Sequence, residues 1–180
     1  MKLIAIAVLT ATFVIPSTAP SSVLGQTRRR TTPRAPSAAA TAQRAAQVRT
    51  QGATRVAEQI KHLTRFTYLL GGVNSSIATV DEDIRRNQAS PQMVQQNQES
   101  KTRVKTSIQG FREVLDKLEI DFRATPELQP FYIKLAGVAA GAATAEQQAA
   151  ANQFDAAGRS LLNVINRLAD VLVLMQGTRI

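Results

Sequence analysis

The chain has 180 residues, of which 22 are basic and 13 acidic, and its formal net charge is +9. It contains no Cys and one His, His62, so disulfide bonds, thiolate nucleophiles, thiolate zinc sites and iron–sulfur clusters are excluded within the chain.

Residues 1–25 have the order of a secretory signal peptide. Lys2 precedes an apolar run from Leu3 to Ile15, which Pro16 ends, and small polar residues follow. That run is shorter than the roughly 20 residues that a helix needs to cross a bilayer, so we expect cleavage rather than retention as an anchor. We expect the mature chain to start at Gln26, which stands where a bacterial lipoprotein would need Cys. The sequence therefore predicts an exported protein, periplasmic or secreted, that is not a lipoprotein.

The positive charge is concentrated in a basic, low-complexity arm, residues 26–55. Between residues 26 and 57 there are seven arginines and no acidic residue, whereas residues 58–180 hold 14 basic and 13 acidic residues. We interpret residues 26–41, which are rich in Thr, Pro, Ser and Ala, as disordered, and residues 42–55 as a frayed lead into the first helix.

Such an arm has two interpretations: a binding element for anionic polymers or lipid head groups, or a solvated linker that keeps the protein soluble. The arm has no aromatic residue, which argues against stacking on nucleic-acid bases. The candidate anion-binding residues are Arg28, Arg29, Arg30, Arg34, Arg44, Arg49 and Arg55.

Helical periodicity dominates from residue 56 onward. Apolar residues recur every seven positions, with others three positions later, which is an a/d stripe. Gly71 and Gly72 each lower helix propensity by about 1 kcal/mol relative to Ala, but the stripe keeps its phase through them, so we predict one long helix, straight or kinked. The sevenfold repeat consists of Val56, Leu63, Leu70, Ile77 and Ile84.

Start signals in the sequence predict three further helices. Ser90 and Pro91 predict the N-cap and first residue of a second helix, and Thr125-Pro126 predicts the start of a shorter third. Residues 144–147 have the form of a capping box and predict the start of a fourth helix, which Gly177 ends. The fold class is all-α: an elongated antiparallel bundle of three long helices plus one shorter helix over residues 56–177, either four-helix or three-helix with a capping helix.

Two features depart from a plain bundle. Asn97 and Lys101 fall on the apolar stripe of the second helix, either because the bundle splays there and both reach solvent, or because they fix helix register or partner choice. The small residues Ala136, Gly137, Ala140 and Gly141, continued by residues 149–151, predict either close helix packing or a groove for an apolar ligand or a partner helix.

No group of residues predicts catalysis, a metal or a cofactor. We interpret Glu58 and His62 as a surface ion pair, and Asp81–Arg85 and Glu82–Arg86 as i to i+4 salt bridges. The acidic residues of the second helix, Glu113, Asp116, Glu119 and Asp121, lie among Arg112, Lys117 and Arg123 and are assigned to its outer face.

The function that this sequence favours is non-enzymatic: an exported helical-bundle protein that acts by binding an envelope protein or an anionic envelope polymer or lipid. The alternatives are an arm-driven tether with an inert bundle, and an enzyme of unknown type.

Overall fold

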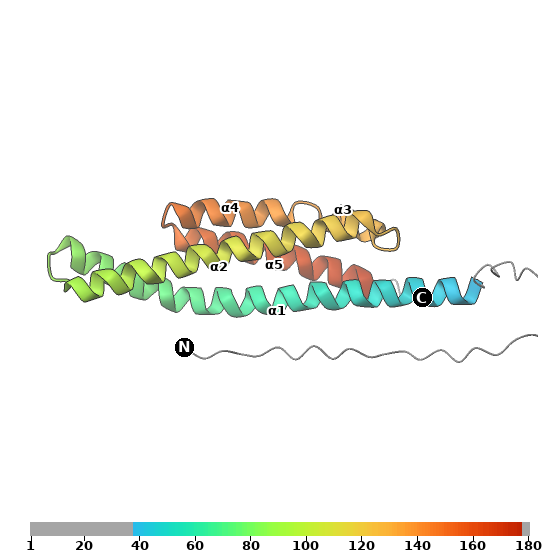
Figure 1. Ribbon diagram of the computed structural model, residues 1–180, viewed down its shortest axis with the longest axis horizontal. Helices are drawn as coiled ribbons and strands as arrows, with labels where there is room; N and C mark the ends of the chain where they lie inside the picture. Colours follow the sequence, from blue (N-terminus) through green and yellow to red (C-terminus); the bar gives the residue numbers. More distant parts are fainter. Residues whose placement is uncertain (1–37, 178–180) are drawn as a thin grey trace, which may run out of the picture. The chain divides into compact units, whose positions relative to one another are not determined.

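The structure is a computed structural model that describes residues 38–177, and helices are the only regular secondary structure in these residues, as expected from the sequence (Figure 1). The predicted signal peptide and residues 26–37 of the arm lie outside the described residues. The five helices are α1 (Ala38–Arg85), α2 (Pro91–Ala124), α3 (Gln129–Leu135), α4 (Val138–Ala150) and α5 (Phe154–Gly177).

Helix α1 is a single helix of 48 residues that runs through Gly71 and Gly72, which confirms the prediction of one long helix. It starts earlier than expected, because residues 38–41 are helical rather than disordered. The segment before residue 56 is also packed rather than frayed: Gly52 is buried, and a Cβ built on it would lie 2.8 Å from Leu128 and 3.1 Å from Met175. The Ala-rich composition after Pro36 supplies the helix propensity for this early start.

Helix α2 starts at the predicted position. Ser90 is its N-cap, with its hydroxyl oxygen accepting a 3.3 Å hydrogen bond from the backbone N–H of Met93, and Pro91 is the first helical residue. At the other end, the N–H of Thr125 donates to the carbonyl of Asp121, and Pro126 follows. The start signals of this helix are therefore confirmed. The predicted start of the third helix at Thr125-Pro126 is wrong, because Thr125 is the C-cap of α2, a turn follows it, and α3 begins only at Gln129.

The predicted third helix is broken into α3 and α4. Gly137 has φ of +90°, a conformation that favours glycine, and it separates the two helices. Two side chains from other helices hold the break. Glu119 of α2 accepts a 2.7 Å hydrogen bond from the N–H of Ala139, and Arg167 of α5 donates to the carbonyl of Ala136 at 3.2 Å.

The predicted capping box at residues 144–147 is wrong. Thr144 lies inside α4, and its hydroxyl donates to the carbonyl of Ala140 at 3.0 Å. The chain turns instead at residues 151–153, where Asn152 has φ of +61°, and α5 begins at Phe154. The capping pattern failed because Glu146 forms an ion pair with Arg112 of α2, at 2.9 Å, rather than a local cap.

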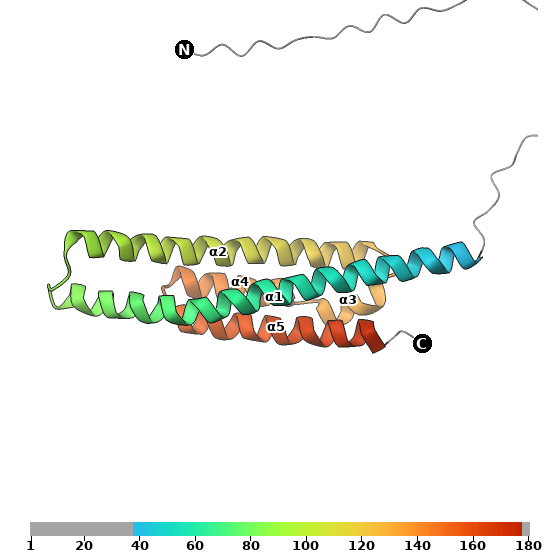
Figure 2. The same cartoon turned by 90° about the horizontal axis from the view of Figure 1, so that it is seen from below.

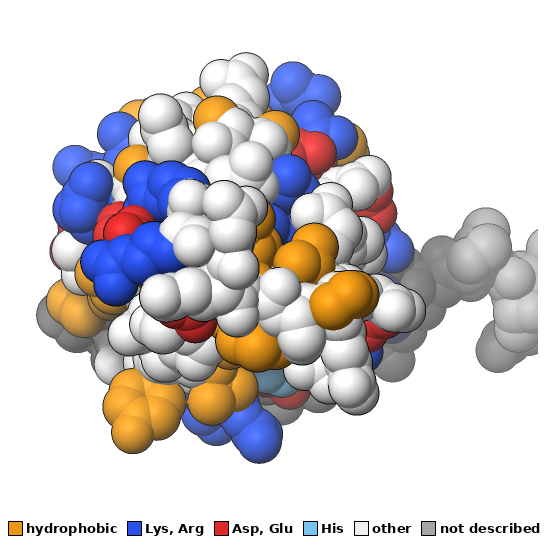
Figure 3. Space-filling view, turned by 90° about the vertical axis from the view of Figure 1, so that its left-hand side faces the viewer, with side chains coloured by type: hydrophobic (Ala, Val, Ile, Leu, Met, Phe, Trp, Pro, Cys, Tyr) orange, Lys and Arg blue, Asp and Glu red, His pale blue; other side chains and the backbone are white. Residues whose placement is uncertain are grey.

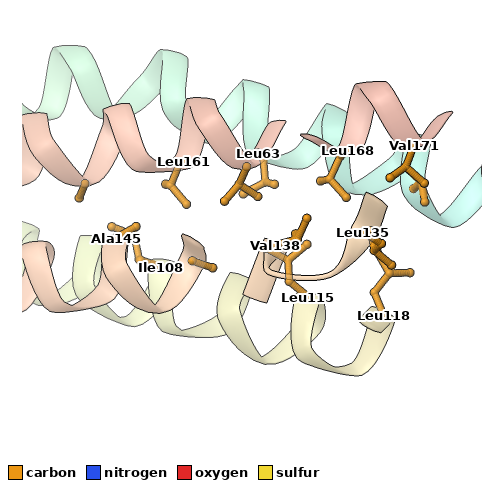
Figure 4. Close-up of a cluster of buried hydrophobic side chains, with 14 of the residues drawn as sticks. Leu63, Ile108, Leu115, Leu118, Leu135, Val138, Ala145, Leu161, Leu168 and Val171 are labelled. Carbon is orange, nitrogen blue, oxygen red and sulfur yellow. The ribbon is translucent and has the colours of Figure 1, made fainter. Parts of the chain in front are cut away.

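Four helices surround one core, in the order α1, α2, α4, α5 around the bundle, and α3 packs against α2 and α5 (Figures 1 and 2). Leucine and other aliphatic side chains from α1, α2 and α5 point into the space between the helices (Figure 4). The fully buried side chains there include Leu63, Ile108, Leu115, Leu161 and Leu168.

Helices α1 and α2 continue past the ends of α4 and α5 as a pair (Figures 1 and 2). The amide of Asn74 donates to Asp155 in the first turn of α5, at 2.7 Å, and so marks where α5 begins beside α1. We call residues 75–104 the projecting hairpin. Among residues 38–177 no helix is long and apolar enough to span a membrane.

Candidate functional site

Three exposed large apolar side chains lie within six consecutive residues in the middle of α1. Tyr68 is 84% exposed, Leu69 54% and Val73 37%, although Leu70 between them is buried in the core. Gly71 and Gly72 stand within the same stretch. We call Tyr68, Leu69, Gly71, Gly72 and Val73 the α1 patch.

The two glycines of the patch have no role in the packing of the described chain. A Cβ built on either would meet nothing within 4 Å, and Gly137 is the only described glycine with a positive φ. Alanine would therefore fit at both positions and would favour the helix by about 1 kcal/mol per residue. Folding of this helix does not explain why glycine stands at both positions.

Elsewhere in residues 38–177 the exposed large apolar side chains are single or, at Val173 and Leu174, paired. Single exposed apolar residues are normal on soluble proteins, whereas a cluster is typical of a binding surface. No other described helix places three of these large side chains within six consecutive residues. The others are Ile84, Val94, Val114, Ile120, Ile133, Leu162, Val173 and Leu174.

A hollow of about 380 Å³ adjoins the patch, between α1 and α2. Val73 of the patch lines it together with Ile77 and Val80 of α1 and Met93 of α2, and no charged side chain is among its lining residues. Deeper along the same seam, the rings of Phe66 and Phe111 pack at 5.1 Å between centroids. The apolar surface of α1 thus extends toward α2 beyond the patch itself.

A buried polar cluster holds the projecting hairpin together. The carboxylate of Asp81 accepts hydrogen bonds from the amide of Asn97 and the ammonium group of Lys101, both at 2.6 Å. Asn97 is only 6% exposed and the side chain of Lys101 16%, so the interpretation in which the bundle splays and both reach solvent is wrong. The predicted Asp81–Arg85 bridge is also wrong, because Asp81 turns toward α2.

The tip of the hairpin is charged. Glu82 forms ion pairs with Arg86, as predicted and at 2.9 Å, and with Arg85. Viewed onto this end of the molecule, charged side chains of both signs gather at the left and hydrophobic side chains in the lower part (Figure 3). Charged side chains also lie at the right of this view, so both kinds of side chain contribute to the surface at this end (Figure 3).

The described arginines of the basic arm have different environments. Arg55 forms a 2.9 Å ion pair with Asp121 of α2 and therefore belongs to the bundle. Arg49 lines a hollow together with Glu127, whereas Arg44 is exposed and forms no ion pair with a described residue. Arg28, Arg29, Arg30 and Arg34 lie outside the described residues.

The small residues at and after Gly137 confirm the prediction of close helix packing. Helices α4 and α5 approach closely at Gly141, because a Cβ built there would lie 2.8 Å from Val164. On the outer side of this contact, Gly137, Ala140 and Gly141 line a hollow of about 430 Å³ that Arg167 closes at one end. The hollow is open, and its polar lining residues point to no particular ligand.

Some of the remaining charged residues are not arranged as predicted. No ion pair joins Glu58 and His62 in the described chain, so that interpretation is wrong. Glu119, Asp121 and Arg112 were assigned to an outer face, but each bonds to another helix. Within residues 38–177, no three potential metal ligands among His, Asp and Glu lie together.

Comparisons with protein-family models, with curated proteins and with solved structures found no match for this chain. Residue contacts are therefore the basis for a functional proposal. Our sequence interpretation did not include the α1 patch. The sequence nevertheless contains an indication of this patch, since Tyr68 and Leu69 lie off the core stripe and close to two glycines.

Proposed function

We propose that this protein is an exported, non-enzymatic binding protein, and that the α1 patch is its contact surface for another protein. The observation that carries the proposal is that the α1 patch combines residues unfavourable for solubility with residues unfavourable for helix stability. Exposed Tyr68 and Leu69 reduce solubility, and Gly71 and Gly72 reduce helix stability, while none of the four improves the packing of the described chain.

The chemistry of the patch suits a protein partner. Tyrosine is enriched among the residues that dominate binding energy, because its ring supplies contact area and its hydroxyl can form a hydrogen bond. A glycine beside it exposes bare backbone, which lets a partner approach closely. The exported compartment of the proposal is supported by the signal-peptide pattern of residues 1–25.

A second candidate function is attachment to an anionic surface through the basic arm. It is supported by the seven arginines without an acidic residue between residues 26 and 57, and by the exposure of Arg44. The ion pair of Arg55 with Asp121 removes one of these arginines from the candidate anion-binding set.

Affinity capture with the full exported chain tests the first proposal. The patch variant is Tyr68→Glu with Leu69→Glu, and the matched control is Ile133→Glu, which changes a side chain that is 79% exposed on α3. We expect proteins captured by the wild-type chain and by the control to be lost with the patch variant, because a buried carboxylate is costly at an apolar interface. Capture that the patch variant leaves unchanged would contradict the proposal.

The same capture separates the arm-based function. Arg28, Arg29, Arg30, Arg34 and Arg44 are changed together to Gln in the full chain, since removing everything before residue 56 would delete the packed Gly52. Two results would support a tether. The wild-type chain binds anionic vesicles and this variant does not, and the binding weakens as the Debye length falls from about 10 Å at 0.1 M salt to about 3 Å at 1 M.

A further inference from the structure

The residues on the outward face of α1 are spaced symmetrically about Gly72. Residues at helical spacing along this face are exposed, apart from half-buried Asp83. In chain order they are Glu58, Lys61, Arg65, Tyr68, Gly72, Ser76, Thr79, Asp83 and Arg86, the last of which directly follows the end of α1. The steps between them are three or four residues, and their order is the same when counted outward from Gly72 in either direction.

We propose that a second copy of this chain occupies the α1 patch, with its α1 antiparallel to the first and the two-fold axis at Gly72. This inference rests on the proposed function, because it names the partner of the same patch. A two-fold interface pairs each residue with the one equally far from the axis on the other copy. Both helices then present their bare Gly72 to each other, which permits close approach.

Charge complementarity favours the antiparallel pairing. Lys61 and Asp83 lie 11 residues on either side of Gly72, so each Lys61 faces Asp83 of the second copy. Glu58 and Arg86 lie 14 residues on either side and also face each other with opposite charge. A parallel pairing would instead place each charge beside its own like charge, which is unfavourable.

The charges of this face are available for a partner. Within residues 38–177 no ion pair involves Glu58, Lys61, Arg65 or Asp83. Arg86, by contrast, already bonds to Glu82 at 2.9 Å. Lys61 and Asp83 are therefore the stronger of the two cross-copy pairs. Within one straight helix they are about 33 Å apart, at about 1.5 Å per residue, so they cannot meet in a single copy.

The apolar side chains also find complementary neighbours. Tyr68 faces Ser76 of the second copy, so this large side chain lies opposite a small one. The hydroxyl of Ser76 already donates to the carbonyl of Gly72, at 3.1 Å, and therefore does not need a partner across the interface. Large side chains against small ones allow two helices to pack closely, with a shallow crossing of about 20°.

Charge exchange in the full exported chain tests this pairing by sedimentation velocity. A contact of one helix from each copy is small, so we expect a wild-type dimer with a dissociation constant in the micromolar range. Lys61→Glu alone, or Asp83→Lys alone, should raise that constant about tenfold, because two symmetric pairs become repulsive. The double variant Lys61→Glu with Asp83→Lys should restore dimerisation, which is possible only if the two positions meet between copies.

Single cysteines provide an independent test in a chain that has none of its own. Gly72→Cys places a thiol at the two-fold axis and should give a disulfide-linked dimer on mild oxidation. Gly110→Cys on α2 is the matched control, because its Cβ also meets nothing within 4 Å, and it should remain monomeric.

Two results would overturn the second copy as occupant of the patch. The wild-type chain stays monomeric at concentrations 100-fold above the micromolar range, or the double variant dimerises no better than the single variants. The binding role of the patch would survive that result if the patch variant still loses a different captured protein. If the patch variant keeps both the dimer and the captured protein, the second copy and the binding role of the patch are both contradicted.

Discussion

Lys101 of α2 donates a hydrogen bond to Asp81 of α1 at 2.6 Å, and the side chain of Lys101 is only 16% exposed. The same carboxylate accepts from Asn97, so one acidic group satisfies two buried donors of the facing helix. This cluster lies on the projecting hairpin, where α4 and α5 no longer cover α1 and α2 (Figure 1).

Asp81→Asn should therefore destabilise the protein by about 1 to 3 kcal/mol, because a hydrogen-bonded charge is lost and the largely buried ammonium group of Lys101 remains without its counterion. Urea unfolding measures the change. Asp116→Asn on the exposed face of α2 is the control and should shift stability by less than about 0.5 kcal/mol. Equal shifts for the two variants would mean that the cluster does not stabilise the hairpin.

Core packing predicts a large difference between two positions of α2. Leu115 is fully buried, and Leu115→Ala should cost about 2 to 5 kcal/mol. Phe111 is half-buried against Phe66, so Phe111→Ala should cost nearly as much. Gln95 is exposed, and Gln95→Ala should stay within about 0.5 kcal/mol. Similar melting temperatures for all three would contradict the orientation of α2.

Gly137→Ala should destabilise the protein by about 1 to 3 kcal/mol, since the φ of +90° is unfavourable for Ala and the new Cβ would lie 2.7 Å from Arg167. The matched substitution Gly110→Ala meets no neighbour and should stabilise α2 by up to about 1 kcal/mol. Thermal unfolding of the two variants should move in opposite directions; a shared direction would contradict the break between α3 and α4.

The glycines of the α1 patch allow stability and binding to be separated. Gly71→Ala and Gly72→Ala should each stabilise the unbound chain by up to about 1 kcal/mol, because alanine favours the helix and has room. Gly72→Ala should nevertheless weaken binding at the patch, since the added methyl group prevents close approach. Unfolding measured at dilution gives the first quantity and affinity capture the second. A variant that is stabilised and still binds fully would show that the glycine is not required for contact.

The helices were predictable where the signal was local. Ser90 and Pro91 give the start of α2 because an N-cap and a first-turn proline act within one turn of the chain. The stripe of α1 continues through Gly71 and Gly72 because burial of Leu70 and Ile77 outweighs the propensity cost.

The misassignments came from contacts between helices. The capping box at residues 144–147 failed because Glu146 pairs with Arg112, far away in the sequence. The assignment of Asp81 to Arg85 failed because a facing helix offered two buried donors. Nothing in the spacing of single residues indicates which helix will face them.

The proposed binding surface was missed for a related reason. Periodicity identifies the buried face of a helix, and Tyr68 and Leu69 lie outside that face, where the periodic pattern does not restrict the residue type. Only the exposure of these side chains, together with the empty space beside Gly71 and Gly72, distinguishes the patch from ordinary helix surface.

The central claim is that this protein acts by binding another protein through the α1 patch, and site-specific photo-crosslinking in the producing cells tests it most directly. A photoreactive amino acid replaces Tyr68 in one strain and Ile133, which is 79% exposed on α3, in another. We expect a discrete protein adduct from residue 68 and none from residue 133, and the mass of the adduct identifies a second copy or a different partner. No adduct from residue 68, or the same adducts from both positions, would contradict the claim.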